Sequence, residues 1–497
     1  MLKTIDSVRQ QLSPRLDAQR KSEFGQFLTP ASVARFMAEL FPKGGGTCRL
    51  LDAGAGVGAL TSAFLDRWER GDMRFSDVEV DAYEIDPILR RHLQEHLDFY
   101  TGRFPVQVRI HQADYIEASV DELAGGFFAG TPHTFTHAIL NPPYKKISSA
   151  SRHRRQLRRV GIETVNLYSA FVALATAQLE EGGLLVAIIP RSFCNGPYYR
   201  PFREFLLEHT ALRHIHLFGA RDKAFKEDSV LQENVIIMVE RGGKQEAVCI
   251  STSTDDGFVD YQATPITFDR VVLTGDKERV IHIPIDGEDQ RCPLSSMCRF
   301  NLAELGVQIS TGPVVDFRLR EHLRDSPEAG TVPLLYPSHF VAEGIDWPKP
   351  PGKKPNALAL LPETQKWLYP LGFYVVTRRL SSKEEKRRIV ASVVDPAAFP
   401  GYAWLGFENH LNVFHQGKQG MPENLARGLA VFLNSTVVDE SFRCFSGHTQ
   451  VNAADLRSMK YPSQEILLAL GRWAKTQGAM SQAEIDEQVE GLIHECH

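Results

Sequence analysis

The hydrophobic pattern of the first half of the chain alternates between short apolar runs and longer segments with helical spacing. The runs typical of buried strands are residues 48–53, 78–84, 106–111 and 135–140. The segments whose apolar residues recur every three or four positions are residues 59–69, 87–99 and about 166–180. Repeated strand–helix units of this kind predict an α/β fold, an open and largely parallel sheet with helices on both faces.

The pattern continues with another strand and a hairpin, and then it breaks. The strongly apolar run LLVAIIP follows Gly182-Gly183 and is typical of a strand. Two more apolar runs, LRHIHLF and NVIIMVE, are expected to form a terminal hairpin. Beyond about residue 245, short β-like runs, prolines and charge clusters replace the strand–helix alternation. We therefore expect two domains, residues 1–244 and residues 245–497, the second of them partly β-rich.

The segment before the first strand contains the motif GQFLTP. Thr29 followed by Pro30 predicts the start of a helix, because a hydroxyl can cap the first turn and proline suits the first helical position. The apolar residues that follow fall at helical spacing.

Composition and charge narrow the class of protein. No run of about 18 apolar residues occurs, and the N-terminus lacks the apolar core of a secretory signal, so we expect a cytoplasmic protein without a membrane span. The seven cysteines are scattered without a CxxC pair, which indicates neither a metal site nor a disulfide framework. The formal net charge is −5, so an enzyme acting on nucleic acid would have to concentrate positive charge locally.

A glycine-rich turn, DAGAGVG, lies between the first strand and the helix at 59–69. Gly54 and Gly56 would let the backbone turn sharply and approach a ligand closely. Asp52 precedes them and suits a positively charged ligand better than a pyrophosphate. The Lys-Ser/Thr pair of a phosphate-binding loop does not follow, so we expect a different cofactor.

Two further carboxylates follow the next two strands. Glu84 ends the second strand and could accept hydrogen bonds from both ribose hydroxyls of an adenosine. Asp114 follows the third strand and could accept from the adenine amino group. Either residue alone could be a loop carboxylate in water. Their position at the carboxyl ends of successive strands instead predicts a cofactor site at that edge of the sheet.

The motif Asn141-Pro142-Pro143-Tyr144 directly follows the strand at 135–140 and should lie at the same edge. An exocyclic amino nitrogen is a poor nucleophile, because its lone pair is delocalised into the ring. The carbonyls of the Asn141 side chain and the Pro142 backbone would return electron density to that nitrogen by accepting its N–H bonds. The prolines would stiffen the backbone, and Tyr144 could stack on a base pulled out of the duplex. No Pro-Cys pair occurs, which argues against a cytosine-C5 methylase.

The order of these motifs resembles that of the gamma group of amino-methyltransferases from restriction–modification systems. The series is GQFLTP, DAGAGVG, YEIDP, QADY and NPPY, followed by a C-terminal region. Residues 374–391, 407–415 and 432–462 resemble the C-terminal blocks of PstI-like type II adenine methylases. The resemblance therefore covers most of the chain.

This resemblance implies a Rossmann-like S-adenosylmethionine-dependent methyltransferase domain followed by a DNA target-recognition domain. It implies S-adenosyl-L-methionine as the cofactor, and the asparagine form of the motif fits N6 of adenine better than N4 of cytosine. The cofactor-binding residues expected from the motifs and the resemblance are Phe24, Gly25, Thr29, Pro30, Asp52, Gly54, Gly56, Glu84 and Asp114. The expected catalytic residues are Asn141, Pro142, Pro143 and Tyr144.

Two basic clusters and one segment rich in hydrogen-bonding groups are candidates for DNA contact. The segment KKISSASRHRRQLRRVG follows the catalytic motif without an acidic residue, which predicts a mobile, phosphate-binding segment. The cluster from Arg378 to Arg388 is interrupted by Glu384 and Glu385, as in a mixed-charge helix, and FSGHTQVN is rich in hydrogen-bonding groups. Both clusters could instead be ordinary solvated surface. The expected DNA-binding residues are Lys145, Lys146, Arg152, Arg154, Arg155, Arg378, Arg379, His448 and Gln450.

Together these features predict a site-specific DNA adenine-N6 methyltransferase that flips its target base and protects host DNA in a restriction–modification system. Two alternatives stay open: a protein glutamine-N5 or RNA base methyltransferase, which would use the same NPPY chemistry, and a non-catalytic DNA-recognition subunit. The sequence shows no convincing nuclease-like domain, so a cognate restriction endonuclease would be a separate chain. One chain can modify a symmetric site strand by strand, so we expect a monomer acting on double-stranded DNA.

Overall fold

The computed structural model divides into two compact units, Met1–Gly287 and Glu288–His497. The structure describes residues 1–12, 28–125, 133–219, 233–284, 298–341, 344–350, 352, 354–381, 385–446 and 450–494.

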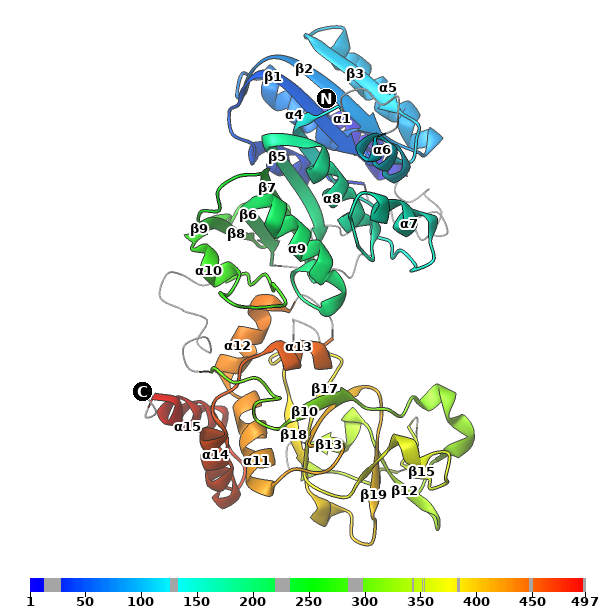
Figure 1. The fold of residues 1–497 in the computed structure, drawn as a ribbon, viewed down its shortest axis with the longest axis vertical. Coiled ribbons are helices and arrows are strands. Elements are labelled where there is room, and N and C mark those ends of the chain that lie inside the picture. The colour runs from blue at the N-terminus through cyan, green and yellow to red at the C-terminus, as the bar shows by residue number, and fades with distance from the viewer. Residues whose placement is uncertain are drawn as a thin grey trace. The chain divides into compact units, whose positions relative to one another are not determined.

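The first unit is built on a nine-stranded sheet with the strand order β3-β2-β1-β4-β5-β7-β6-β8-β9 (Figure 1). Its strands are β1 (Gly45–Ala53), β2 (Arg74–Tyr83), β3 (Val106–His111), β4 (Phe135–Leu140), β5 (Leu179–Pro190), β6 (Thr210–Phe218), β7 (Asn234–Arg241), β8 (Val248–Ser253) and β9 (Gln262–Ile266). The strands from β3 to β5 run parallel, and β7 pairs antiparallel with both β5 and β6. The predicted α/β sheet is confirmed. The two runs expected to form a terminal hairpin do pair as β6 and β7, but they do not end the sheet, because β8 and β9 follow β6.

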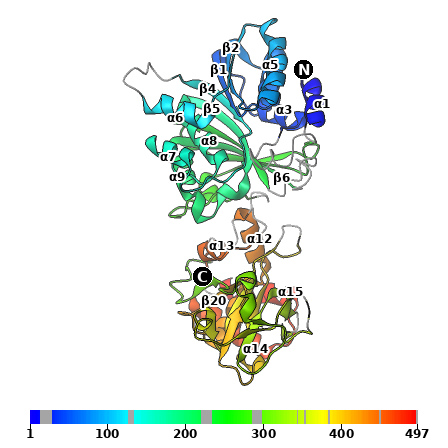
Figure 2. The same cartoon turned by 90° about the vertical axis from the view of Figure 1, so that its right-hand side faces the viewer.

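Helices cover both faces of this sheet, as predicted. They are α1 (Leu2–Leu12), α3 (Ala31–Glu39), α4 (Ala59–Glu69), α5 (Pro87–Thr101), α6 (Tyr115–Ala124), α7 (Arg152–Arg159), α8 (Leu167–Gln178), α9 (Arg200–His209) and α10 (Phe268–Val271). Figure 2 shows α1, α3 and α5 on one side of the sheet and α6, α8 and α9 on the other. Leu50 belongs to one hydrophobic core and Leu51 to the other, because successive side chains of a strand point to opposite faces.

The structure places the boundary between the units later than the expected division after residue 244. Strand β8 pairs parallel with β6, and β9 pairs antiparallel with β8, so both strands extend the large sheet. The first unit accordingly continues to Gly287. The strand–helix alternation ends near residue 245, but the sheet does not.

The second unit combines small sheets with helices, in agreement with the partly β-rich composition expected for it. Its sheets have the strand orders β10-β20-β17-β18, β11-β15-β12-β19-β16 and β13-β14. The strands are β10 (Gln308–Thr311), β11 (Leu323–Arg324), β12 (Thr331–Leu335), β13 (Phe340–Val341), β14 (Gly344–Ile345), β15 (Ala357–Ala359), β16 (Leu368–Pro370), β17 (Tyr374–Arg378), β18 (Ala391–Val394), β19 (Trp404–Phe407) and β20 (Leu411–His415). The helices are α11 (Glu423–Leu433), α12 (Thr436–Phe445), α13 (Ala453–Ser458), α14 (Gln464–Thr476) and α15 (Gln482–His494).

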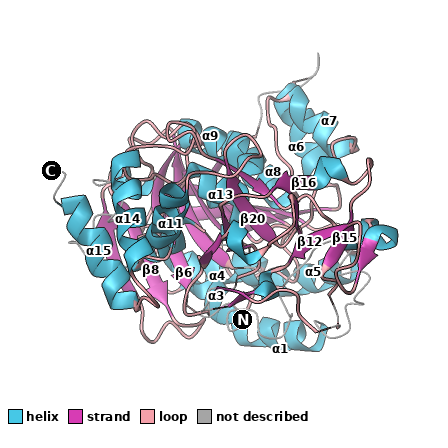
Figure 3. Ribbon diagram, turned by 90° about the horizontal axis from the view of Figure 1, so that it is seen from below, coloured by secondary structure: helices cyan, strands magenta, loops and turns pink. Residues whose placement is uncertain are grey.

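Helices α11 and α14 pack against each other, and Figure 3 shows them side by side. Two glycines allow this close approach. A Cβ atom on Gly428 would lie 1.8 Å from the Leu467 carbonyl oxygen, and one on Gly471 would lie 1.7 Å from that of Asn424. Any larger residue at either position would force the helices apart.

None of the helices in the described part of the chain has the length and apolar character needed to cross a membrane. Within the same residues, no group of three or more His, Cys, Asp or Glu side chains could hold a metal ion.

Candidate active site

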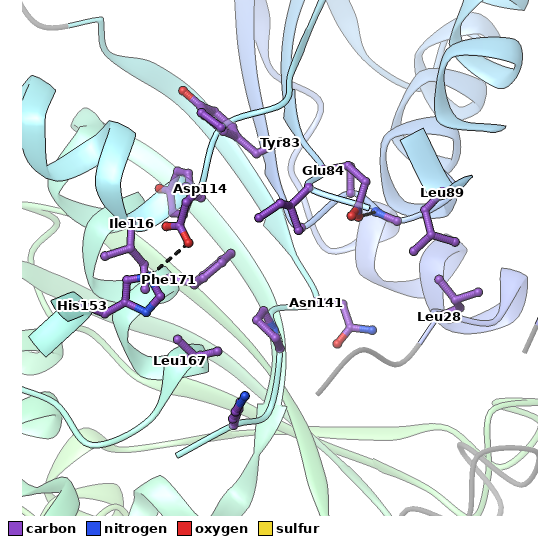
Figure 4. Close-up of a pocket in the computed structure, with 18 of the residues that line it drawn as sticks. Leu28, Tyr83, Glu84, Leu89, Asp114, Ile116, Asn141, His153, Leu167 and Phe171 are labelled. Carbon is purple, nitrogen blue, oxygen red and sulfur yellow. Dashed lines mark hydrogen bonds and ion pairs between the residues drawn. The ribbon is translucent and has the colours of Figure 1, made fainter. Parts of the chain in front are cut away.

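A cavity of about 420 Å³ lies where strands β1 to β4 end. Its walls come from the four segments that follow these strands, together with Leu28, Thr29, Leu167 and Phe171. Figure 4 shows Glu84, Asp114 and Asn141 around this space. The cavity therefore brings together the four loops that the sequence singled out.

The turn after β1 depends on glycines in the left-handed region. Gly54, Gly56 and Gly58 have φ values of 81°, 58° and 87°. The backbone N–H groups of Gly54 and Ala55 donate to the Tyr83 carbonyl, which ties the turn to the end of β2. A Cβ atom on Gly54 would lie 3.9 Å from the Asn141 carbonyl oxygen, so the turn passes close to the motif Asn141-Pro142-Pro143-Tyr144.

Glu84 connects the end of β2 to the glycine turn. Its side chain lines the cavity although the residue is only 2% exposed. One carboxylate oxygen accepts the Gly56 N–H at 2.9 Å, and the other accepts the Asp86 N–H at 2.7 Å. Burial raises the pKa of Glu84 to about 7, against the lowering effect of these two hydrogen bonds.

Asp52 lies beneath the glycine turn and not in the wall of the cavity. It is fully buried, accepts a hydrogen bond from the Thr61 hydroxyl at 2.6 Å, and is not among the described residues that line the cavity. Burial raises its pKa to about 7. The structure therefore gives Asp52 a supporting position below the glycine turn, and its expected role in cofactor binding stays a prediction.

Asn141 follows β4 and faces the cavity, with its carboxamide held by hydrogen bonds. The Asn141 Nδ2 donates to the Thr29 hydroxyl at 2.9 Å, and the Tyr144 hydroxyl donates to Asn141 Oδ1 at 3.2 Å. The sequence predicted that Thr29 caps α3, and this prediction is wrong. The cap position is Pro30, and it makes no side-chain cap hydrogen bond. The Thr29 hydroxyl instead accepts the hydrogen bond from the Asn141 carboxamide.

Tyr144, which was expected to stack on a target base, contacts other residues of the first unit in this structure. Its hydroxyl also lies 3.1 Å from the Ile188 carbonyl, and its ring packs edge to face with Tyr168. Tyr144 is not among the described residues that line the cavity, whereas Pro143 is. In this structure Tyr144 contacts Asn141 through its hydroxyl and does not line the cavity itself.

Sequence relatives identify the family of this site. The chain is 49% identical over 497 residues to the type II methyltransferase M.BsuBI of Bacillus subtilis, covering 99% of this chain and 98% of that protein. It is 41% identical over 490 residues to the type II methyltransferase M.PstI of Providencia stuartii, covering 97% and 95% respectively. The chain belongs to the type II methyltransferases. Residues 92–225 of this methyltransferase also match the family of the Eco57I restriction-modification methylase.

Among solved structures, the methyltransferase is similar in fold to the cryo-EM structure of the DrdV–DNA complex. The TM-score is 0.56 at 12% sequence identity, covering 95% of this chain and 59% of that chain. At this identity the similarity concerns the fold alone.

The segment after the catalytic motif contains regular secondary structure. Residues 145–147 form backbone hydrogen bonds with residues 165–167, and Lys145 and Lys146 line the cavity with exposed side chains. Residues 152–159 form helix α7, whose arginines pair with carboxylates from elsewhere in the first unit. These ion pairs are Arg152–Glu117, Arg154–Glu163, Arg158–Glu163 and Arg159–Asp121. The segment is therefore helical over residues 152–159, and its charge is partly compensated by acids that lie outside it in the sequence. Its mobility and its contact with DNA stay predictions.

The candidate DNA-binding residues of the second unit are partly brought together. Strand β17 ends at Arg378, and the Arg379 N–H donates to the His410 carbonyl. Leu380 forms a β-bridge with Gln450, which places residues 378–380 beside Gln450. No helix forms over the described residues of 378–388, contrary to the mixed-charge helix expected there.

Other members of these clusters have different positions. Arg388 is only 2% exposed, and its backbone N–H donates to Asp439, so it cannot contribute to a basic surface. Arg155 is exposed and donates to the Ala150 carbonyl. Phe24, Gly25 and His448 lie outside the described residues.

Several residues of the site were missed by the reasoning from sequence. They are the apolar wall residues Leu28, Ile85, Leu89, Ile116, Leu167 and Phe171, and the polar residue His153. Ile85 and Ile116 follow closely after the two acidic residues singled out at the strand ends, so their position in the sequence was an available signal. Phe171 and His153 come from helices, and no local pattern marked them.

Proposed function

We propose that this type II methyltransferase transfers a methyl group from S-adenosylmethionine to N6 of an adenine flipped out of double-stranded DNA, within one short sequence. The observation that carries the proposal is the Asn141 carboxamide, which Thr29 and Tyr144 hold in the same cavity as Glu84. A fixed carbonyl acceptor beside a nucleoside-sized site fits transfer to an exocyclic amino group.

The cavity suits S-adenosylmethionine in shape and chemistry. Gly54 and Gly56 leave room that side chains would fill, and the buried Glu84 carboxylate lines the cavity as an acceptor group suited to ribose hydroxyls. Ile85, Ile116 and Phe171 offer apolar surface for an adenine ring. When bound, this cofactor supplies a methyl group on a positively charged sulfur.

The residues of the chain prepare the target nitrogen for attack. Asn141 Oδ1 and the Pro142 carbonyl would accept the two N–H bonds of the amino group and so raise the electron density on N6. The Tyr144 hydroxyl helps to hold Oδ1 in place by donating a hydrogen bond to it. After transfer, the surplus proton on N6 passes to water. The base-stacking role expected for Tyr144 would require the ring to leave Tyr168.

Lys145 and Lys146 are the best-placed candidates for phosphate contact, because they are exposed at the cavity that contains Asn141. Each lysine–phosphate contact on duplex DNA contributes about 0.9 to the slope of log affinity against log salt concentration. Replacing both lysines by alanine is therefore expected to reduce that slope by about 1.8 in binding titrations across a salt series.

The control for this measurement is Lys43→Ala, an exposed lysine just before β1, at the opposite edge of the sheet. The control should keep the slope of the wild-type protein. An unchanged slope in the double variant would show that phosphate contact lies elsewhere, and the candidates would then be Arg155 and, in the second unit, Arg378, Arg379 and Gln450.

The biological setting is also part of the proposal. A type II methyltransferase that marks one DNA sequence would protect host DNA in the cytoplasm from a cognate restriction endonuclease on a separate chain. Modification strand by strand requires only a monomer.

Product analysis tests the proposed reaction. Purified protein is incubated with methyl-labelled S-adenosylmethionine and either plasmid DNA, transfer RNA or a glutamine-containing release-factor peptide, and the products are digested and separated. We expect label in N6-methyldeoxyadenosine alone. Label in N4-methyldeoxycytidine, RNA or the peptide would contradict the proposal, and a protein that binds cofactor and DNA without transfer would support a recognition subunit.

A further inference from the structure

The carboxylate of Asp114 is held at both of its oxygens. Oδ1 accepts the Glu117 N–H at 3.1 Å and thereby caps helix α6. Oδ2 lies 3.1 Å from Nε2 of His153, the contact drawn as a dashed line in Figure 4. Both side chains line the cavity and are about one-third exposed, Asp114 at 30% and His153 at 31%.

His153 reaches Asp114 from helix α7. Ser151 caps this helix by accepting the Arg154 N–H, and the Arg152–Glu117 and Arg159–Asp121 ion pairs attach α7 to α6. The imidazole is therefore presented from a helix that is fixed at two further points. Since α7 follows the catalytic motif, this contact connects that segment to the cofactor side of the cavity.

We propose that His153 is a positioning residue for recognition of the cofactor's adenine, because it fixes the Asp114 carboxylate in the orientation that accepts the adenine amino group. This inference rests on the proposed use of S-adenosylmethionine. Oδ2 has two lone pairs, so it can accept from His153 and from an amino group together. Without His153, the carboxylate would keep its hydrogen bonds from backbone N–H groups at the start of α6 but would lose the imidazole that holds Oδ2.

The charged groups around the pair support an ionised carboxylate. Burial opposes the charge on Asp114, but hydrogen bonds from His153 and the Glu117 backbone outweigh it and lower the pKa of Asp114. The hydrogen bond to Asp114 raises the pKa of His153, Glu117 acts in the same direction, and burial and Arg152 oppose it. A carboxylate kept ionised in this way is a strong acceptor for an N–H donor.

The test compares two ligands that differ at the amino edge of the purine: S-adenosyl-L-homocysteine, and S-inosyl-L-homocysteine, which has a carbonyl at position 6 and a proton on N1. Affinities of the full-length protein are measured by calorimetry for the wild type, His153→Ala and His153→Gln. We expect His153→Ala to lower affinity for the adenosyl ligand about tenfold and to leave affinity for the inosyl ligand unchanged. His153→Gln retains an N–H donor and should restore most of the adenosyl affinity.

The matched control is His92→Ala on helix α5. His92 also lies 3.1 Å from a carboxylate, that of Glu95, and neither residue lines the cavity. This variant should bind both ligands as the wild type does, and thermal unfolding verifies that each variant is folded.

The outcomes separate the inference from the proposed function. If His153→Ala lost affinity for both ligands equally, or kept the wild-type ratio of adenosyl to inosyl affinity, the positioning role would be overturned and His153 would have a structural role. A wild type that does not prefer the adenosyl ligand would also overturn it. A wild type that binds neither ligand would contradict the proposed cofactor itself.

Discussion

Replacing Asn141 by alanine is expected to lower kcat for DNA methylation by roughly a hundred- to a thousandfold, the usual effect of removing one preorganised group at a reacting centre. The variant loses the side-chain acceptor that raises electron density on the target nitrogen. Affinity for S-adenosylhomocysteine should stay close to that of the wild type, because Glu84 and the glycine turn are untouched. Single-turnover methylation and calorimetry measure the two quantities separately.

Thr29→Val is the graded companion of this variant. It keeps the Asn141 carboxamide but removes the hydroxyl that accepts the Nδ2 hydrogen bond. We expect a loss of kcat of about tenfold, since the acceptor remains and only its orientation is less restricted. Near-normal methylation by Asn141→Ala would contradict the assigned chemistry.

Replacing Glu84 by alanine is expected to weaken binding of S-adenosylhomocysteine at least about a hundredfold, since hydrogen bonds to a charged group contribute about 1.5–3 kcal/mol each. The variant loses the acceptor for ribose hydroxyls and also leaves the Gly56 and Asp86 N–H groups without their carboxylate. Glu84→Gln keeps one acceptor oxygen, so its affinity for S-adenosylhomocysteine should fall between those of the wild type and Glu84→Ala.

The control is Glu79→Ala on the same strand, β2. Glu79 pairs with Arg109 and does not line the cavity, so this variant should bind the ligand normally. Unchanged binding by a folded Glu84→Ala protein would exclude Glu84 as the ribose acceptor.

Cofactor binding is also expected to depend on pH. Burial raises the pKa of Glu84 to about 7, and hydroxyl donors prefer the ionised carboxylate. Ligand affinity should therefore fall by about tenfold as the pH is lowered from about 8 to about 6. Burial also raises the pKa of Asp52 to about 7. The Glu84→Gln variant separates the contributions of the two carboxyl groups, because it should remove only the pH dependence that is due to Glu84.

Much of the first unit was predictable because its signals are local. The predicted limits of α4, β3 and β4 match the structure, since apolar runs and spacing define them directly. Strands β1 and β2 begin earlier than predicted, because exposed residues such as Gly45 and Arg74 still pair across the sheet. The addition of β8 and β9 to the sheet depends on pairing between distant segments, and no local pattern shows it.

The candidate site shows the same limit. Asn141, Glu84 and Asp114 were placed together by a topological rule, namely that the ends of parallel strands meet at one edge of the sheet. The partners of these residues could not be predicted in this way. Thr29, His153 and the α6 acids that pair with α7 are far along the chain from their partners, and only the fold brings them into contact.

The most direct test of the central claim is single-molecule modification sequencing of DNA from a methylation-deficient host that expresses this methyltransferase, with Asn141→Ala as the control. We predict N6-methyladenine at one short sequence throughout the genome, and its absence with the variant. Unmodified adenine in cells that contain folded, cofactor-binding wild-type protein, or a different modified base, would contradict the account.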